Sequence, residues 1–337
     1  MAFDSKPARV PPPFAVAPAM LGWVRDRKLQ VRLDEFGKAQ SLRGLTAAVV
    51  DLSSAIKAPK LPAAVAYGGY RDEAQTYAAS FVKVGIMLAA YRLREQVREA
   101  AIKLSIADIK ALASDLQGDW LPLIAQEAQG RPVKFPSFGE IFEPGVDARK
   151  TDFGSEFSHQ IDLMVEGVGK NSAAAFCTER LGFAYINGVL RTEGLLEGHF
   201  GRSDLKGISL SLDYGGHFWA GKEGGAAGQG ATAKAMAAFF TALYTRQLVS
   251  IGASDDMIGH LSVANSWFKA GLVENRRKHL HTISKIGVDG TFSEGAIIER
   301  PGDLKYIRYV AAVMGAPNFD ILWEAIVKID SIIDDRF

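Results

Sequence analysis

Segments with the composition of β-strands occupy both ends of this chain, and a long stretch with helical periodicity separates them. The strand-like runs are rich in β-branched residues, and an Asp289-Gly290 turn signal lies between two of them. The predicted strands cover residues 45–52, 63–67, 282–288, 295–300 and 306–314. This order predicts an α/β (α+β) fold, in which an antiparallel sheet flanked by helices carries an inserted all-helical half, rather than a doubly wound parallel sheet. We expect a ligand cleft where the two halves meet.

Residues 1–19, which include three consecutive prolines, predict an extended N-terminal arm, and residues 20–337 predict a single domain. The halves of this domain are expected at about 20–75 and 250–337 for the sheet half, and about 76–249 for the helical half.

Four further segments carry clear local signals. Residues 72–100 predict a strong helix, and residues 317–333 predict an amphipathic helix that closes the chain. The glycine-rich stretch 198–230 predicts a long surface loop. Thr232 then has the residue type of an N-cap, for a helix that runs to about residue 248.

Composition excludes several classes of function. The chain has 337 residues and a formal net charge of +1, so no basic excess points to nucleic acid or to an anionic membrane surface. No apolar window reaches the ~18 residues of a membrane span. The N-terminal residues lack a secretory core, which predicts a cytoplasmic protein, or a periplasmic or secreted one if a leader has been lost.

Cysteine and histidine usage argues against metal and cofactor chemistry. The single cysteine, Cys177, excludes an intrachain disulfide and a cysteine-based zinc cluster, and its apolar neighbours predict a buried, inert thiol. The six histidines form no ligand spacing; His279 and His281 share a strand face but lack a third ligand nearby. We therefore expect no metal and no cofactor.

Ser80-Phe-Val-Lys83 places a hydroxyl one helical turn from an amine, at the start of an apolar run. A lysine in apolar surroundings disfavours its charged form and can accept the proton of a serine nucleophile. The same spacing occurs at Ser54 and Lys57, at Ser203 and Lys206, and at Ser266 and Lys269. Only Ser80 opens a buried-looking helix directly after strand-like sequence, so only there do we expect a desolvated lysine.

Two later segments contain residues that could act together with Ser80 and Lys83. Asn171 ends the stretch that begins at Met164, and Lys285 and Gly287 lie in Ile-Ser-Lys-Ile-Gly. With Ser80 and Lys83, these segments resemble, in order, the motifs of the penicillin-recognising serine enzymes, closest to the class A β-lactamases. The resemblance runs from about residue 45 to 315, with flanking matches at residues 49–52, 181–182, 194–195 and 231–250.

The resemblance implies a role for each matched residue. Ser80 would be the nucleophile and Lys83 its base, while Asn171 would orient Lys83 or a substrate amide. The backbone N–H groups of Ser80 and Val288 would form the oxyanion hole. Lys285 would attract an anionic substrate.

Two more positions belong to the implied binding site. Gly287 would let the strand approach the substrate closely. Lys170, beside Asn171, would line the site.

Three departures from the family pattern bear on turnover. Gly169 and Lys170 stand where the family has the serine and aspartate of Ser-Asp-Asn, so the hydroxyl that passes a proton to a leaving nitrogen is missing. Ile286 replaces the threonine of Lys-Thr-Gly. Asp204 falls where the family has its general-base glutamate, one methylene shorter, which threatens deacylation more than acylation.

A second placement of the middle motif also exists. Tyr185-Ile-Asn187 matches the Tyr-x-Asn of class C enzymes, in which the tyrosine carries the proton. The spacing of the flanking segments favours Asn171 instead.

The predicted function is therefore a serine hydrolase or acyl transferase that acts through a Ser80 acyl-enzyme on an amide, ester or lactam, with weak or no efficient β-lactam hydrolysis. The alternative is a non-catalytic or penicillin-binding protein that binds a ligand or partner in the same cleft. A cell-wall peptidase or transpeptidase is a third reading, opposed by the missing signal segment. The oligomeric state is not predicted.

Overall fold

The computed structural model describes residues 11–14, 22–42, 44–53, 64–221, 225–262, 265–274, 280–302 and 306–336. Most of the expected N-terminal arm lies outside these residues. Its described part packs on the protein: Trp120 Nε1 donates a hydrogen bond to the Pro11 carbonyl at 2.8 Å, and the ring of Phe14 stacks on Tyr185.

Within the described residues, six strands form one sheet in the order β1-β3-β2-β11-β10-β9. They are β1 (Gly22–Arg25), β2 (Thr46–Asp51), β3 (Ala64–Tyr70), β9 (His281–Val288), β10 (Phe292–Pro301) and β11 (Tyr306–Ala316). All neighbours are antiparallel except the parallel pair β1 and β3. The expected antiparallel sheet from both ends of the chain is confirmed, and β2 pairing with β11 joins the two ends.

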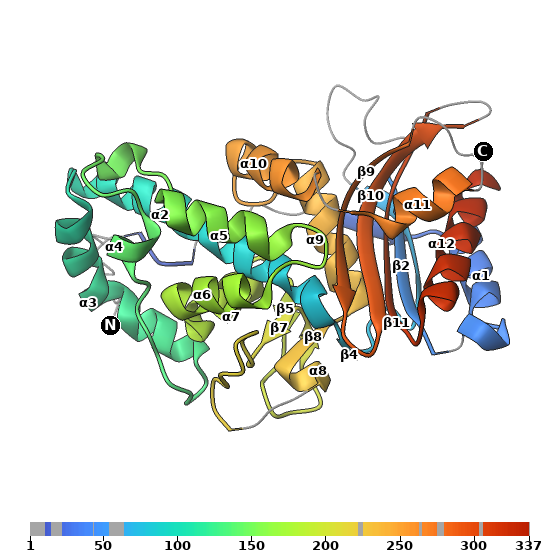
Figure 1. Cartoon of the computed structure of the whole chain (residues 1–337), viewed down its shortest axis with the longest axis horizontal. Helices are drawn as coiled ribbons and strands as arrows, with labels where there is room; N and C mark the ends of the chain where they lie inside the picture. Colours follow the sequence, from blue (N-terminus) through green and yellow to red (C-terminus); the bar gives the residue numbers. More distant parts are fainter. Residues whose placement is uncertain are drawn as a thin grey trace, which may run out of the picture.

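Helices cover both faces of this sheet (Figure 1). The outer face packs on α1 (Arg27–Phe36), α11 (Trp267–Glu274) and α12 (Phe319–Asp334), and the inner face on α9 (Ala233–Tyr244). A hydrophobic core lies on each face of the sheet, and alternate residues of β2 contribute to the two cores. Val49 belongs to the outer core and Val50 to the inner core. Helix α9 was expected in the helical half, yet it packs against the sheet.

The helical half surrounds the long buried helix α2 (Figure 1). It contains α2 (Lys83–Leu104), α3 (Ile109–Glu127), α4 (Phe138–Ile141), α5 (Ser155–Val165), α6 (Asn171–Leu181) and α7 (Phe183–Thr192), with α10 (Ile251–Ser262) beside it. Among the described helices, none combines the length and apolarity that crossing a bilayer requires.

The helix predicted over residues 72–100 begins later than expected. Residues 76–77 form the short strand β4 (Thr76–Tyr77), and residues 79–82 form the 3₁₀ turn η2 (Ala79–Val82) before α2. Strand β4 pairs with β8 (Gln229–Ala231), so the backbone of residues 76–77 is extended and not helical. The left-handed backbone of Ala79, at φ +45°, also separates strand from helix.

The glycine-rich stretch is largely irregular, as expected, but short pairings organise it. They involve β5 (Leu196–Glu197), β6 (Lys206–Gly207), β7 (Ser209–Leu210) and β8, with a single turn of helix α8 (Gly225–Gly228). Because β8 pairs with both β7 and β4, this stretch is held beside the turn that carries Ser80. The cap at Thr232 is confirmed, since its Oγ1 accepts the Ala235 N–H at 3.1 Å, although α9 ends near Tyr244.

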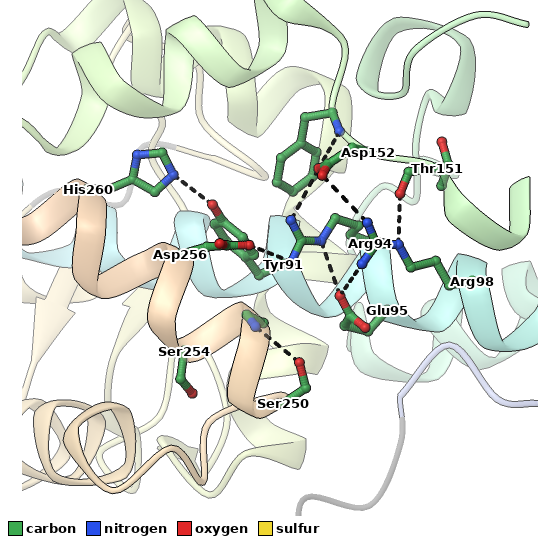
Figure 2. A network of polar contacts seen from close by, with 12 residues as sticks. Tyr91, Arg94, Glu95, Arg98, Thr151, Asp152, Ser250, Ser254, Asp256 and His260 are labelled. Carbon is green, nitrogen blue, oxygen red and sulfur yellow. Dashed lines mark hydrogen bonds and ion pairs between the residues drawn. The ribbon is translucent and has the colours of Figure 1, made fainter. Parts of the chain in front are cut away.

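A polar network fastens α2 to α10 and to the segment around Asp152 (Figure 2). The buried Arg94 side chain donates to Asp152 at 3.1 Å and to Asp256 at 2.8 Å. One turn earlier, the Tyr91 hydroxyl lies 2.6 Å from His260 Nε2. These contacts connect the middle of α2 to two neighbouring segments (Figure 2).

The outer face of the sheet contains a buried ion pair whose loss should destabilise the protein. Arg300 is fully buried and donates to Asp330 at 2.8 Å and to Asp334 at 2.6 Å. Removing one partner leaves a buried charge without compensation, so Arg300→Met should lower the free energy of unfolding by about 3 kcal/mol. Urea denaturation measures this change.

The matched control is Arg32→Met. Its ion pair with Asp335, at 3.2 Å, is half exposed, so the change should be below about 1 kcal/mol. Equal effects of the two substitutions would contradict the prediction.

Candidate active site

Ser80 lies in the η2 turn, between β4 and α2, at the edge of a cleft of about 720 Å³. The strained backbone of Ala79 immediately precedes it, and the Tyr214 hydroxyl donates to the Ala79 carbonyl at 2.8 Å. Such outliers persist where surrounding contacts enforce them. Ser80 also stands in the first turn of a helical segment, where N–H groups have no acceptor within the helix.

Lys83, the first residue of α2, has its ammonium group in a cage of neutral oxygens. Its Nζ donates to the Gly169 carbonyl at 3.0 Å, to Asn171 Oδ1 at 2.9 Å and to the Val168 carbonyl at 3.4 Å. The ring of Tyr214 covers it, with the centroid 4.6 Å from Nζ. No carboxylate of a described residue pairs with Lys83, and burial lowers its pKa to about 7. The lysine can therefore be neutral near neutral pH.

The turn before Asn171 requires glycine at position 169. Gly169 has φ +77°, and a Cβ there would lie 1.9 Å from the Met164 carbonyl oxygen. A serine therefore cannot occupy this position in the observed backbone. Lys170 and Asn171 follow at the start of α6 and line the cleft together with Ser80.

Lys285 differs from its expected role. Its Nζ donates to the carbonyls of Gly167 and Val168, the latter at 3.0 Å, and the side chain is fully buried. Burial, together with the nearby Lys83, lowers the pKa of Lys285 well below its ordinary value. Lys285 thus lies behind the turn that forms the cleft wall, instead of presenting its charge to a substrate.

The end of β9 lies directly against the turn of Ser80. A Cβ on Gly287 would be 2.5 Å from the Ala78 carbonyl oxygen and 2.8 Å from the Phe81 nitrogen, so only glycine permits this approach. Ile286 is buried and lies on the strand face opposite to Lys285, because side chains alternate.

Val288 lines the cleft at the edge of the sheet. Beyond it, the Asp289 N–H donates to the Thr291 carbonyl at 3.1 Å. Hydrogen-bonded and non-bonded pairs alternate in an antiparallel ladder, so the pair Val288 and Phe292 is of the non-bonded type. This alternation directs the Val288 N–H away from β10, as an oxyanion donor requires.

The prediction for Asp204 is wrong. Its carboxylate is half exposed, pairs with His199 Nδ1 at 3.3 Å, and does not line the cleft. The spacing argument failed because the glycine-rich stretch folds back through β7, so a later part of it reaches Lys83. From this stretch, the cleft is lined by Leu212, Asp213, Tyr214, Gly216 and Gln229, and the Gly-Gly pair after Tyr214 was the available turn signal.

The competing candidates lie elsewhere. Tyr185 is fully buried within α7, and Asn187 bonds to the backbone of Leu210, so the class C placement is not supported. Ser266 donates to the buried Glu294 at 2.8 Å, and Ser203 is exposed in a loop. Ser54 and Lys57 lie outside the described residues.

The remaining cysteine and histidine predictions have simple outcomes. Cys177 is buried, and burial raises the pKa of its thiol. His281 pairs with Glu299 at 3.7 Å, while His279 lies outside the described residues. In the described part of the chain, no group of three or more His, Cys, Asp or Glu side chains is placed to hold a metal ion.

Comparisons with known proteins agree with this geometry. Residues 158–333 match the model of the Beta-lactamase enzyme family, which is more than half of the chain. No curated protein sequence matches. The chain is thus a β-lactamase-like protein by class, and it belongs to the Beta-lactamase enzyme family.

Solved structures share the fold at low identity. A β-lactamase from Sphaerobacter thermophilus is 15% identical, with a TM-score of 0.53 over 89% of this chain and 94% of that one. PBP-A is 17% identical, with a TM-score of 0.55 over 95% and 99%. A mutant of PBP-A, solved as an acyl-enzyme complex with penicillin G, is 16% identical, with a TM-score of 0.54 over the same shares.

Restoring the family's serine at position 169 should damage the protein. Gly169→Ser combines a left-handed backbone with a clash against the Met164 carbonyl, so we expect a loss of stability of about 3 kcal/mol or more and a displaced Lys83. Gly130→Ser is the control, because Gly130 has φ +83° but open space around its Cβ position. Thermal unfolding of both variants checks this; equal effects would attribute the cost to backbone strain alone.

Buried Lys83 should also make stability depend on pH. The pKa of Lys83 is about 7 in the folded protein against an ordinary value of 10.5, so between these limits the unfolded chain binds more protons. Stability must then rise with pH across this window. Relative to Lys83→Met, the parent should gain at most about 1.4 kcal/mol per pH unit from pH 7 to 10. If the stabilities of the parent and of Lys83→Met differed by the same amount at every pH, the prediction would be contradicted.

Proposed function

We propose that the protein is a serine hydrolase or acyl transferase that forms an acyl-enzyme on Ser80 with a small ester, amide or lactam. The observation that carries the proposal is the state of Lys83, which is buried, bonded only to neutral oxygens and one helical turn from Ser80. A structural lysine would be expected to pair with a carboxylate or to extend its ammonium group into solvent.

Acylation uses groups that surround the cleft. Neutral Lys83 accepts the proton of the Ser80 hydroxyl as Oγ attacks the carbonyl carbon. The N–H groups of Ser80 and Val288 stabilise the negative charge on the substrate oxygen, and one such donor is typically worth about 3 kcal/mol in the transition state. Asn171 Oδ1 holds Lys83 Nζ in position.

Departure of the leaving group favours esters over amides. An amine must receive a proton as it leaves, and position 169 has no hydroxyl to deliver it. An alkoxide or thiolate needs less assistance, so the proton on Lys83 is sufficient for it. Efficient hydrolysis of β-lactams is therefore not expected.

Deacylation is the weaker half of the reaction. A water molecule that attacks the acyl-enzyme needs a base, and both carboxylates of the described cleft lining are already bonded. Asp213 is bonded to Gly215 and His217, and Asp289 to Tyr77. Tyr214 covers Lys83 and is bonded to the Ala79 carbonyl. The acyl-enzyme should consequently persist, which suits transfer to a better nucleophile than water.

A long-lived adduct also favours a second candidate, a penicillin-binding protein with little turnover. The missing hydroxyls at Gly169 and Ile286 support it. The acyl-enzyme of the PBP-A mutant with penicillin G gives a precedent within the same fold.

Intact-mass spectrometry tests the proposal. After exposure to a fluorophosphonate, to p-nitrophenyl acetate or to penicillin G, the parent should carry one adduct on Ser80, and Ser80→Ala should carry none. Ser203→Ala is the matched control, because Ser203 begins another Ser-x-x-Lys tetrad on an exposed loop. The acylation rate should rise with pH through about 7, as Lys83 loses its proton. An adduct on Ser80→Ala, or no adduct on the parent with any reagent, would refute the proposed acylation of Ser80.

A further inference from the structure

The end of the cleft at β9 presents an anionic group that the family resemblance did not predict. Asp289 and Tyr77 both line the cleft, and the Tyr77 hydroxyl donates to Asp289 Oδ2 at 2.6 Å. Burial and the adjacent carboxylate raise the pKa of Tyr77, so its hydroxyl remains a donor. The bond holds the carboxylate in place, and no cation of a described residue pairs with it.

Other charges near the cleft are already engaged or lie on a different wall. Lys83 and Lys285 point their ammonium groups at the carbonyls of the turn before Asn171. Asp213 accepts hydrogen bonds from the N–H groups of Gly215 and His217 and pairs with the ring of His217.

Lys170 is the remaining cation of the cleft lining, and it stands at the start of α6. Among the described lining residues, the charge that directly follows β9 is the carboxylate of Asp289.

The position of Asp289 relates this charge to the reacting carbonyl. Asp289 directly follows Val288, whose N–H is directed as an oxyanion donor, so a group attached to the acyl carbon can reach Asp289 along the strand edge. The ring of Tyr77, which is bonded to Asp289, lines the same cleft. A carboxylate beside an aromatic ring is a combination that recognises ammonium groups, through charge and through the negative face of the ring.

We propose that the cleft selects acyl groups that carry an ammonium group, and that Asp289, positioned by Tyr77, recognises this group. The inference rests on the proposed acylation of Ser80 and specifies its substrate class. It replaces the expectation of an anionic substrate, because Lys285 lies behind the cleft wall. In the step concerned, the Ser80 Oγ–carbon bond forms, the bond from carbon to the leaving oxygen breaks, and the serine proton passes to Lys83.

Three p-nitrophenyl esters of matched size test the selectivity. They are the esters of trimethylammonioacetate, which is cationic, of tert-butylacetate, its neutral isostere, and of succinate, which is anionic. Release of p-nitrophenolate gives each acylation rate, and division by the spontaneous hydrolysis rate removes differences in intrinsic reactivity. The parent should prefer the cationic ester over its isostere about five- to tenfold, with the anionic ester slowest, and added salt should reduce the preference.

Two variants assign the preference to its source. Asp289→Asn should abolish the preference for the cationic ester while it still acylates with the neutral one. Tyr77→Phe, which keeps the ring but releases the carboxylate, should reduce the preference partly. Asp34→Asn is the matched control, since it removes one exposed carboxylate on α1, on the outer face of the sheet, and should change nothing.

The outcomes separate this inference from the function on which it rests. Acylation by all three esters at similar corrected rates, or a preference that survives in Asp289→Asn, overturns the inference and leaves the Ser80 enzyme intact. Absence of Ser80 acylation with every ester overturns the proposed function as well.

Discussion

The carbonyl oxygens of residues 167–169 are the feature on which the site depends, because they receive two buried lysines and no carboxylate. Val168 O accepts from Lys83 at 3.4 Å and from Lys285 at 3.0 Å, so the two ammonium groups share one acceptor. Two like charges this close in a buried setting oppose each other's protonation. The turn therefore connects α2 in the helical half to β9 in the sheet, and it also favours a neutral Lys83.

This arrangement explains the glycines around it. Gly169 has a left-handed backbone and abuts the Met164 carbonyl, which turns its own carbonyl toward Lys83. Gly287 lets β9 approach the turn of Ser80, so that Lys285 reaches behind the same loop. The loss of the family's serine at position 169 is thus tied to the geometry that desolvates the base. A side chain there would displace the acceptors of both lysines.

Much of the fold was predictable because the strands and the closing helix carry strong periodic signals. The hairpin around Asp289-Gly290 and the cap at Thr232 follow from local residue types. The pairing of β2 with β11 is a long-range contact that local residue types do not determine. Motif order also agrees with the hydrogen bond between Lys83 and Asn171 and with the position of Ser80 and Asn171 in one cleft. The start of α2 was not, because the pairing of β4 with β8 overrides the helical propensity of residues 72–78.

The errors at the site share one physical origin, which is that spacing along the chain does not encode how an irregular segment folds back. Asp204 has the expected sequence separation, yet the pairing of β7 with β8 brings Tyr214 to Lys83 instead. An aromatic ring can cover an ammonium group but cannot activate water, so this replacement supports our proposal that acylation outpaces deacylation. Likewise, Lys285 has the expected position on its strand, but the turn over it leaves Asp289 as the charge that a substrate on β9 would meet. The chemistry of this cleft is therefore set by which loop covers each lysine as much as by the motif residues themselves.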